Sequence, residues 1–129
     1  MVVPLAIAAL LLAACGTEDE SLVTGSGSGD TYTVTLAADD TSPPTTWRLE
    51  CEPAGGDHPD AAAACAAIKA AANPFEPVPA DMACTEIYGG PGVATVSGVR
   101  QGKRVEARYT RTNGCEISRW DAIGAVIPR

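Results

Sequence analysis

The chain has a single histidine, His58, and this count limits the chemistry that its side chains could perform. A serine or cysteine nucleophile needs a nearby base, most often an imidazole, so any such arrangement would have to use His58. His58 comes directly before Pro59, which is suited to the start of a helix, and we interpret it as a capping or packing residue. The chain also lacks the HExxH, GxxxxGK and GxGxxG motifs. We therefore expect no enzymatic activity, no metal site and no cofactor.

Cysteines are the other residues with distinctive chemistry. Cys15 follows an apolar run, whereas Cys51, Cys65, Cys84 and Cys115 are spread over the rest of the chain. None of their spacings is CxxC, which argues against a zinc knuckle or a thioredoxin-like redox pair. Four cysteines in an exported chain of this size predict two disulfides, for which three pairings are open. Because the chain is rich in alanine and poor in large side chains, we expect these disulfides to supply much of its stability.

The beginning of the chain has the pattern of a targeting segment. Residues 2–14 are an uninterrupted apolar run, shorter than the roughly 20 residues that a bilayer span needs, and they end in Leu12-Ala13-Ala14-Cys15. This arrangement resembles the lipobox of bacterial lipoproteins, in which the cysteine is diacylated and becomes the first mature residue. We expect residues 1–14 to be a signal peptide and Cys15 to anchor the protein to the outer face of the cell membrane. The alternative is an ordinary secretory signal with an incidental Cys15.

Composition divides the remainder into a tether and one domain. Residues 16–30 are acidic and rich in Gly and Ser, so we interpret 15–30 as a lipidated N-terminus with a flexible tether and 31–129 as the domain. The net charge of −7 argues against a nucleic-acid partner, which would require a basic surface. Five basic residues alternate with apolar ones in a pattern typical of a solvated strand face: Arg100, Lys103, Arg104, Arg108 and Arg111.

Hydrophobic periodicity predicts several strands and one clear helix. Alternating apolar and polar residues predict strands at 31–36, 46–51, 93–99 and 104–112, and a last short strand at 122–127. The alanine-rich run at 59–72 predicts a helix with Pro59 at its first position. Trp47 and Trp120 are interpreted as packing residues. This order predicts an α+β fold with one face of the sheet covered.

The segment between the helix and the third strand has a different character. Residues 73–92 contain four prolines and end in Gly89-Gly90-Pro91-Gly92, so they form neither a helix nor a central strand. Within them Cys84 precedes the sequence Thr-Glu-Ile-Tyr, residues 85–88. A disulfide on one side and a Gly-Pro turn on the other would hold this stretch extended and exposed. A protease-binding loop needs this property, because a loop already fixed in its bound shape loses less entropy on binding.

Several short motifs, taken in order, carry a specific resemblance. They are Cys51 with Pro53 and Gly55, His58-Pro59, Ala64-Cys65-Ala66, Met82, Cys84, Tyr88, Gly98-Val99, Gln101-Gly102-Lys103-Arg104-Val105, Asn113, and Cys115-Glu116. This set resembles the Streptomyces subtilisin inhibitor family. The resemblance implies a five-stranded antiparallel sheet with two helices on one face, the disulfides Cys51–Cys65 and Cys84–Cys115, and a homodimer formed sheet to sheet. It also implies inhibition of an extracellular serine protease of the subtilisin type.

Position by position, the resemblance implies a reactive bond between Glu86 and Ile87. Glu86 would be the P1 residue, with Cys84, Thr85 and Tyr88 completing the loop, and Asn113 would support it through hydrogen bonds. A carboxylate is costly in an apolar specificity pocket, so Glu86 indicates either a glutamate-preferring target or weak inhibition of ordinary subtilisins. The alternative to an inhibitor is a cell-surface lipoprotein that keeps the fold and serves as a binding or structural module.

Overall fold

The structure is a computed structural model, and it describes residues 29–129. The predicted signal peptide, Cys15 and nearly all of the predicted tether lie outside the described residues. Between residues 29 and 129, no helix has the length and apolar character needed to cross a bilayer.

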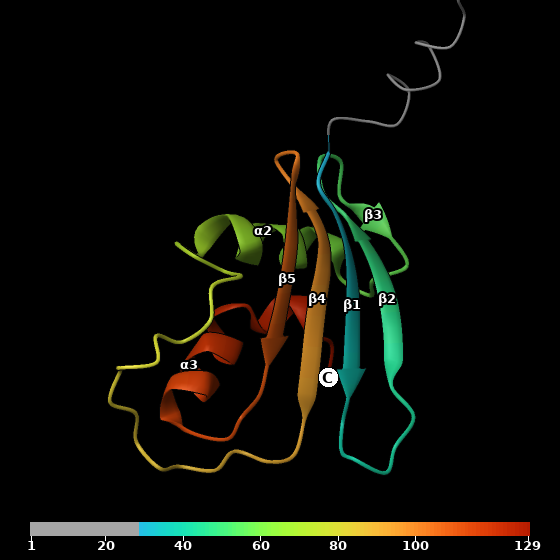
Figure 1. Ribbon diagram of the computed structural model, residues 1–129. Coiled ribbons are helices and arrows are strands. Elements are labelled where there is room, and N and C mark those ends of the chain that lie inside the picture. The colour runs from blue at the N-terminus through green and yellow to red at the C-terminus, as the bar shows by residue number, and fades with distance from the viewer. Residues whose placement is uncertain (1–28) are drawn as a thin grey trace, which may run out of the picture.

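One five-stranded antiparallel sheet forms the centre of the fold (Figure 1). Its order is β3-β2-β1-β4-β5, so the strand nearest the N-terminus lies in the middle. The strands are β1 (Thr31–Ala37), β2 (Thr45–Glu50), β3 (Gly55–Gly56), β4 (Val93–Arg100) and β5 (Lys103–Tyr109). The five-stranded antiparallel prediction is confirmed.

Two helices cover one face of this sheet, as predicted, and leave the other face to solvent (Figure 1). They are α2 (Ala61–Ala70) and α3 (Gly114–Ala122), and a short 3-10 turn, η1 (Gly124–Val126), follows the second. The core lies between the helices and the alternate strand residues that point toward them. Its largest fully buried side chains are Val34, Leu49, Val96, Tyr109, Ile123, Val126 and Ile127.

Both disulfides have the pairing that the family resemblance implied. Cys51–Cys65 joins the end of β2 to α2, with the two Cα atoms 5.6 Å apart, and Cys84–Cys115 joins the proline-rich segment to α3, at 5.3 Å. The first bridge fixes the helix against the sheet, and the second fixes the segment that contains the predicted reactive bond. The prediction of two disulfides in this pairing is confirmed.

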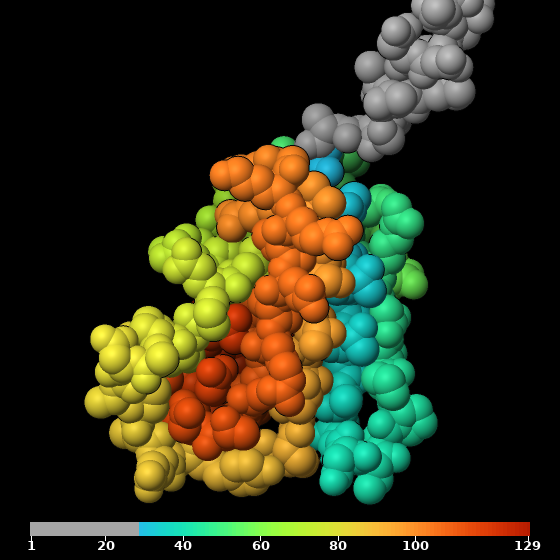
Figure 2. Space-filling view, viewed as in Figure 1, coloured from blue at the N-terminus to red at the C-terminus, as the bar shows by residue number. Residues whose placement is uncertain are grey.

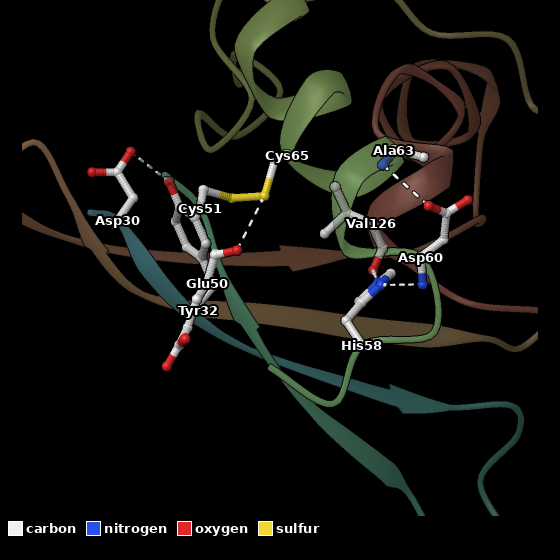
Figure 3. The surroundings of a disulfide bond; sticks show 9 residues. All are labelled: Asp30, Tyr32, Glu50, Cys51, His58, Asp60, Ala63, Cys65 and Val126. Carbon is white, nitrogen blue, oxygen red and sulfur yellow. Dashed lines mark hydrogen bonds between the residues drawn. A yellow bond between two sulfur atoms is a disulfide. The ribbon is translucent and has the colours of Figure 1, made fainter. Parts of the chain in front are cut away.

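His58 is a buried packing residue beside the start of α2 (Figure 3). Its Nδ1 accepts a hydrogen bond from the backbone N–H of Asp60 at 3.0 Å, and its Nε2 donates to the carbonyl of Val126 at 2.9 Å. Asp60 caps the helix by accepting from the N–H of Ala63 at 3.2 Å. Both ring nitrogens of His58 are thus used in hydrogen bonds, and the imidazole links η1 to the start of α2. This agrees with the interpretation of His58 as a capping or packing residue.

Three local predictions were wrong. Residues 122–127 are not a strand, because the last residues of α3 and the turn η1 occupy that range. The fifth strand is instead β3, a two-residue bridge to β2 that has no hydrophobic alternation to reveal it. Pro59 lies outside α2, which begins after its cap Asp60.

The basic residues of β4 and β5 behave in two different ways. Lys103, Arg104 and Arg108 are exposed, as the strand pattern predicted. Arg100 and Arg111 are less exposed, and each packs on an aromatic ring: Arg100 on Phe75, with its Cζ 5.8 Å from the ring centroid, and Arg111 on Trp120, at 5.5 Å. The prediction that all five basic side chains are solvated was therefore wrong for these two.

Candidate functional site

The predicted reactive segment is an exposed stretch of irregular backbone at one end of the molecule. We call residues 85–88 the exposed strip. All four of its residues are exposed, and two are large and apolar: 59% of Ile87 and 65% of Tyr88 is accessible to solvent. Met82, just upstream, is also exposed at 53%. Neighbouring apolar side chains left in solvent are typical of a surface that binds another protein.

The first anchor of the strip lies on its N-terminal side. Cys84 is bonded to Cys115, and the backbone N–H of Gly114 donates to the carbonyl of Thr85 at 2.9 Å. Gly114 is the first residue of α3, and a Cβ on it would lie 2.0 Å from Oγ1 of Thr85. The close approach of strip and helix therefore depends on a glycine at position 114.

The second anchor lies on the C-terminal side of the strip. The N–H of Gly89 donates to the carbonyl of Arg111 at 2.6 Å, and Nε of Arg111 donates back to the carbonyl of Gly89 at 3.3 Å. Both anchors come from residues 111–114, which are the end of the connection between β5 and α3 and the first residue of that helix. The strip is thus fastened at its two ends to the same support, and Glu86, Ile87 and Tyr88 project between the anchor points.

This geometry is what a substrate-like loop requires. All four residues of the strip are exposed while the chain on both sides of them is fastened, so a protein that meets this end of the molecule would contact the strip directly. Residues 28–113 match the subtilisin inhibitor-like family, which is about two thirds of the chain. The chain belongs to the subtilisin inhibitor-like family.

Several relatives of this inhibitor-like chain come from Streptomyces. Plasminostreptin of Streptomyces antifibrinolyticus is 46% identical over 70 residues, which are 52% of this chain and 63% of that protein. Kexstatin-1 of Streptomyces platensis is 42% identical over 74 residues, 54% of this chain and 50% of its own. Subtilisin inhibitor-like protein 4 of Streptomyces lavendulae is 38% identical over 91 residues, 68% of this chain and 75% of its own. The chain thus spans about half to two thirds of the length of the first two.

A solved structure is also similar. It is the crystal structure of Streptomyces caespitosus sermetstatin in complex with Bacillus licheniformis subtilisin. The likeness covers 76% of this chain and 96% of that one, at 24% sequence identity and a TM-score of 0.48.

Asn113 of the inhibitor-like domain lies beside the strip, in the connection that supports it. Its Oδ1 accepts from the backbone N–H of Glu116 at 2.9 Å, which caps the N-terminus of α3. Within residues 29–129, the hydrogen bonds from this connection to the strip region come from its neighbours Arg111 and Gly114. Asn113 thus fixes the start of the helix whose first residue, Gly114, holds Thr85.

A proline-rich strap, residues 73–83, lies behind and upstream of the exposed strip, along the outer edge of α3 (Figures 1 and 2). The hydroxyl of Tyr109 donates to the carbonyl of Pro74. Nε of Arg119 donates to the carbonyl of Glu76 at 2.6 Å. An open pocket of about 720 Å³ lies between the strap and α3. The strap is held by these bonds and by packing at its start, where Pro74 is buried and Phe75 lies against the core.

Tyr109 and Arg119 also interact directly with each other. The Arg119 guanidinium lies over the Tyr109 ring, with its Cζ 4.1 Å from the centroid, and its Nη1 donates to the carbonyl of Arg108 at 2.6 Å. Burial raises the pKa of Tyr109 to about 12, although the nearby positive charge of Arg119 opposes this shift. Tyr109 is therefore a neutral hydrogen-bond donor throughout the physiological range.

Sequence reasoning did not identify two residues that hold the exposed strip in the structure, Arg111 and Gly114. Arg111 belongs to a run of alternating basic residues, and nothing in that pattern separates it from its solvated neighbours. Gly114 lies next to Cys115, and the Cys84–Cys115 pairing was a signal that residues near position 114 face the strip. Within residues 29–129, no group of three His, Cys, Asp or Glu side chains is placed to hold a metal ion.

Proposed function

We propose that this protein inhibits a serine protease by presenting the exposed strip as a substrate, with Glu86–Ile87 as the reactive bond. The observation that carries the proposal is the double fastening of the strip to residues 111–114, by Gly114 to Thr85 and by Arg111 to Gly89. Membership of the subtilisin inhibitor-like family supports it. The protein acts as a ligand for an enzyme rather than as an enzyme.

The proposed mechanism is a cleavage that the scaffold reverses. The serine oxygen of the protease attacks the Glu86 carbonyl, whose oxygen enters the oxyanion hole, and the C–N bond to Ile87 breaks as the Ile87 nitrogen takes up a proton. In an ordinary substrate the new amine then diffuses away. Here both sides of the cut bond stay fixed to residues 111–115, so the amine can attack the acyl-enzyme and re-form the peptide bond.

The P1 residue determines which protease binds. Glu86 is an exposed carboxylate, and an apolar specificity pocket would strip it of water without supplying a partner. A pocket with a cation or several hydrogen-bond donors would compensate for that loss. We therefore propose a glutamate-preferring serine protease as the better target and a subtilisin with an apolar pocket as the weaker one.

The same carboxylate favours a second candidate function. If no protease that meets this protein accepts glutamate, the domain would serve as a binding or structural module that has lost strong inhibition. Both candidates share the fold and the strip, and they differ in the affinity for an active protease.

We further propose that the protein is extracellular, either secreted or anchored through a lipid on Cys15. Two disulfides are typical of an oxidising compartment. β1 begins at the upper end of the sheet in Figure 1, whereas the segment that contains the exposed strip runs along the lower end. A domain anchored through its N-terminal side would therefore hold the strip away from the membrane by roughly the length of β1, about 20 Å. The homodimer stays a prediction from the family resemblance.

Titration of active proteases tests the proposed function. The purified protein is added to a fixed amount of a glutamate-preferring serine protease and, separately, of a subtilisin, and residual activity on a small substrate is recorded. We expect competitive inhibition of both, stronger for the glutamate-preferring enzyme. No inhibition of either at about 10 μM, a weak affinity for a protein complex, would favour the binding module. As a control, the variant Glu106→Gln changes an exposed carboxylate on the sheet, far from the strip in sequence, and it should inhibit both proteases as the parent does.

A further inference from the structure

The two sides of the Glu86–Ile87 bond are not held in the same way. On the side of Glu86, a covalent bridge, Cys84–Cys115, and the hydrogen bond from Gly114 to Thr85 fix the chain. On the side of Ile87, the next fastening is at Gly89, which exchanges hydrogen bonds with Arg111. A disulfide cannot position the leaving amine of Ile87, because Cys84 lies on the other side of the bond. The position of that amine after cleavage therefore depends on two bonds at Gly89: one to the backbone carbonyl of residue 111, which any residue there would supply, and one from the Arg111 side chain.

Arg111 is itself held in a fixed orientation. Its Nη1 lies 3.0 Å from Oδ1 of Asp121, and its guanidinium packs on the ring of Trp120, which is buried in the core. The planar guanidinium uses one nitrogen for Asp121 and another, Nε, for the carbonyl of Gly89. A planar group with donors in fixed directions can hold two acceptors in one geometry, which a lysine ammonium cannot do.

Gly89 is fitted closely to this side chain. A Cβ at position 89 would lie 3.1 Å from Cβ and from Nε of Arg111, and 2.9 Å from Cδ1 of Ile117. The backbone at residue 89 therefore lies directly against the arginine and the helix α3. The contact of Arg111 with Gly89 is not needed for an ion pair with Asp121, so the arginine does more than neutralise that carboxylate.

We propose that Arg111, braced by Asp121 and Trp120, is the positioning residue that keeps the Ile87 amine in place and so makes inhibition last. This inference rests on the proposed function. During religation the Ile87 nitrogen attacks the carbonyl carbon of the acylated Glu86 and forms the peptide bond. The ester bond between that carbon and the protease serine oxygen breaks, and the proton lost by the nitrogen passes to the serine hydroxyl. Arg111 takes no part in these bond changes. It limits how far the amine moves while water competes for the acyl-enzyme.

The arginine should matter little for folding. Its ion pair with Asp121 is partly exposed, with 25% of the Arg111 side chain and 51% of that of Asp121 accessible, so the pair itself contributes little to stability. Loss of the contact with Trp120 removes some packing at the edge of the core but leaves the core residues in place. Arg111→Ala should therefore fold, keep both disulfides and bind the protease at first. Its inhibition should be shorter-lived, because water will hydrolyse the acyl-enzyme and release the cleaved inhibitor before the peptide bond is re-formed.

The experiment compares the full chain with Arg111→Ala, Arg111→Lys and a control, Arg104→Ala, which removes an exposed arginine of β5. Each is incubated with a protease that the parent inhibits, and both the initial inhibition constant and the rate of cleavage at Glu86–Ile87 are measured. We expect both Arg111 variants to be cleaved about tenfold faster or more, with inhibition that decays, since a small displacement of a reacting group has effects of this size. The initial inhibition constant should change much less. Arg104→Ala should match the parent.

Amide hydrogen exchange gives a reading that needs no protease. Arg111→Ala keeps the backbone carbonyl that accepts the Gly89 N–H but loses the side chain that holds residue 89 beside it. The Gly89 N–H of the free variant should therefore exchange faster than in the parent, while core amides such as that of Val96 stay unchanged. If Arg111→Ala inhibits as durably as the parent, or if Arg111→Lys does so, the positioning role is overturned while the proposed function stands. If the parent itself inhibits no protease, the proposed function is overturned and the positioning role with it.

Discussion

The first residue of helix α3, Gly114, lies directly against Thr85, the residue before Glu86 in the exposed strip. Its N–H donates to the Thr85 carbonyl at 2.9 Å, and a Cβ on Gly114 would approach Oγ1 of Thr85 to 2.0 Å. The hydrogen bond and the absence of a side chain act together, since the bond forms only if the backbone can come this close. The first residue of α3 therefore both begins the helix and supports the proposed inhibitory site from behind.

Gly114→Ala should separate stability from inhibition. The added methyl group will displace Thr85 and with it Glu86, so we expect inhibition to weaken by about tenfold, or about 1.4 kcal/mol. Alanine is the better helix former, so the loss in free energy of unfolding should be much smaller than the loss in binding free energy. Gly124→Ala is the matched control, because a Cβ there meets no atom within 4 Å. Equal inhibition by the two variants would argue against the role of Gly114.

Glu86→Met should redirect the inhibitor. An apolar side chain enters an apolar pocket without the cost of desolvating a carboxylate, so inhibition of a subtilisin should strengthen by at least about 1.4 kcal/mol, tenfold in the inhibition constant. Inhibition of a glutamate-preferring protease should weaken. Glu106→Met, on the outer face of the sheet, should change neither constant. Inhibition constants that do not depend on residue 86 would show that Glu86 is not the P1 residue.

Tyr109→Phe should alter how stability depends on alkaline pH. The pKa of Tyr109 is raised from 10.0 to about 12 in the folded state, so between these values the unfolded chain releases a proton that the folded chain keeps. Stability therefore falls as pH rises through this window, and below pH 10 the group causes no pH dependence. The free energy of unfolding of the phenylalanine variant, measured with urea on both sides of about pH 10, should decline less steeply than that of the parent. A slope equal to that of the parent would contradict this assignment.

Cys15→Ser tests the anchor proposed from the sequence. If Cys15 carries the lipid, the variant should be released from the membrane fraction or should keep its signal peptide, because serine cannot form the thioether to the lipid. Cell fractionation followed by mass measurement of the protein distinguishes these results. Membrane association unchanged by the substitution would exclude the anchor and favour an ordinary secretory signal. Neither outcome affects the proposed inhibitory site.

Much of the fold could be predicted because its strands alternate cleanly. In β1, Tyr32 and Val34 are buried in the core whereas Thr31 and Thr33 are exposed, which is the alternation from which the strand was predicted. The family resemblance implied a second helix, but periodicity did not place α3, although Asn113, three residues before Glu116, is a recognisable cap signal. Strand β3 could not be found, since two glycines carry no periodicity and pair with β2 only through tertiary folding.

The part of the site that could be predicted is the part that follows from the order of residues along the chain and from the disulfide pairing. The position of Glu86 after Cys84, and the pairing of Cys84 with Cys115, came from motifs that resemble a known family. The contacts of Arg111 with Gly89, Trp120 and Asp121 involve three separate parts of the chain. No local pattern encodes such contacts, so the support of the Ile87 side became visible only in the folded chain.

The most direct test of the account is the identity of the bond that a target protease cuts. After prolonged incubation with a catalytic amount of the protease, the protein is analysed by mass spectrometry before and after reduction. Because Cys84 and Cys115 lie on opposite sides of the Glu86–Ile87 bond, we predict that the unreduced protein gains one water and stays in one piece. Reduction should then release a fragment that begins at Ile87. A new terminus at any other position, in a protease that the protein inhibits, would contradict the assignment of the exposed strip as the inhibitory site.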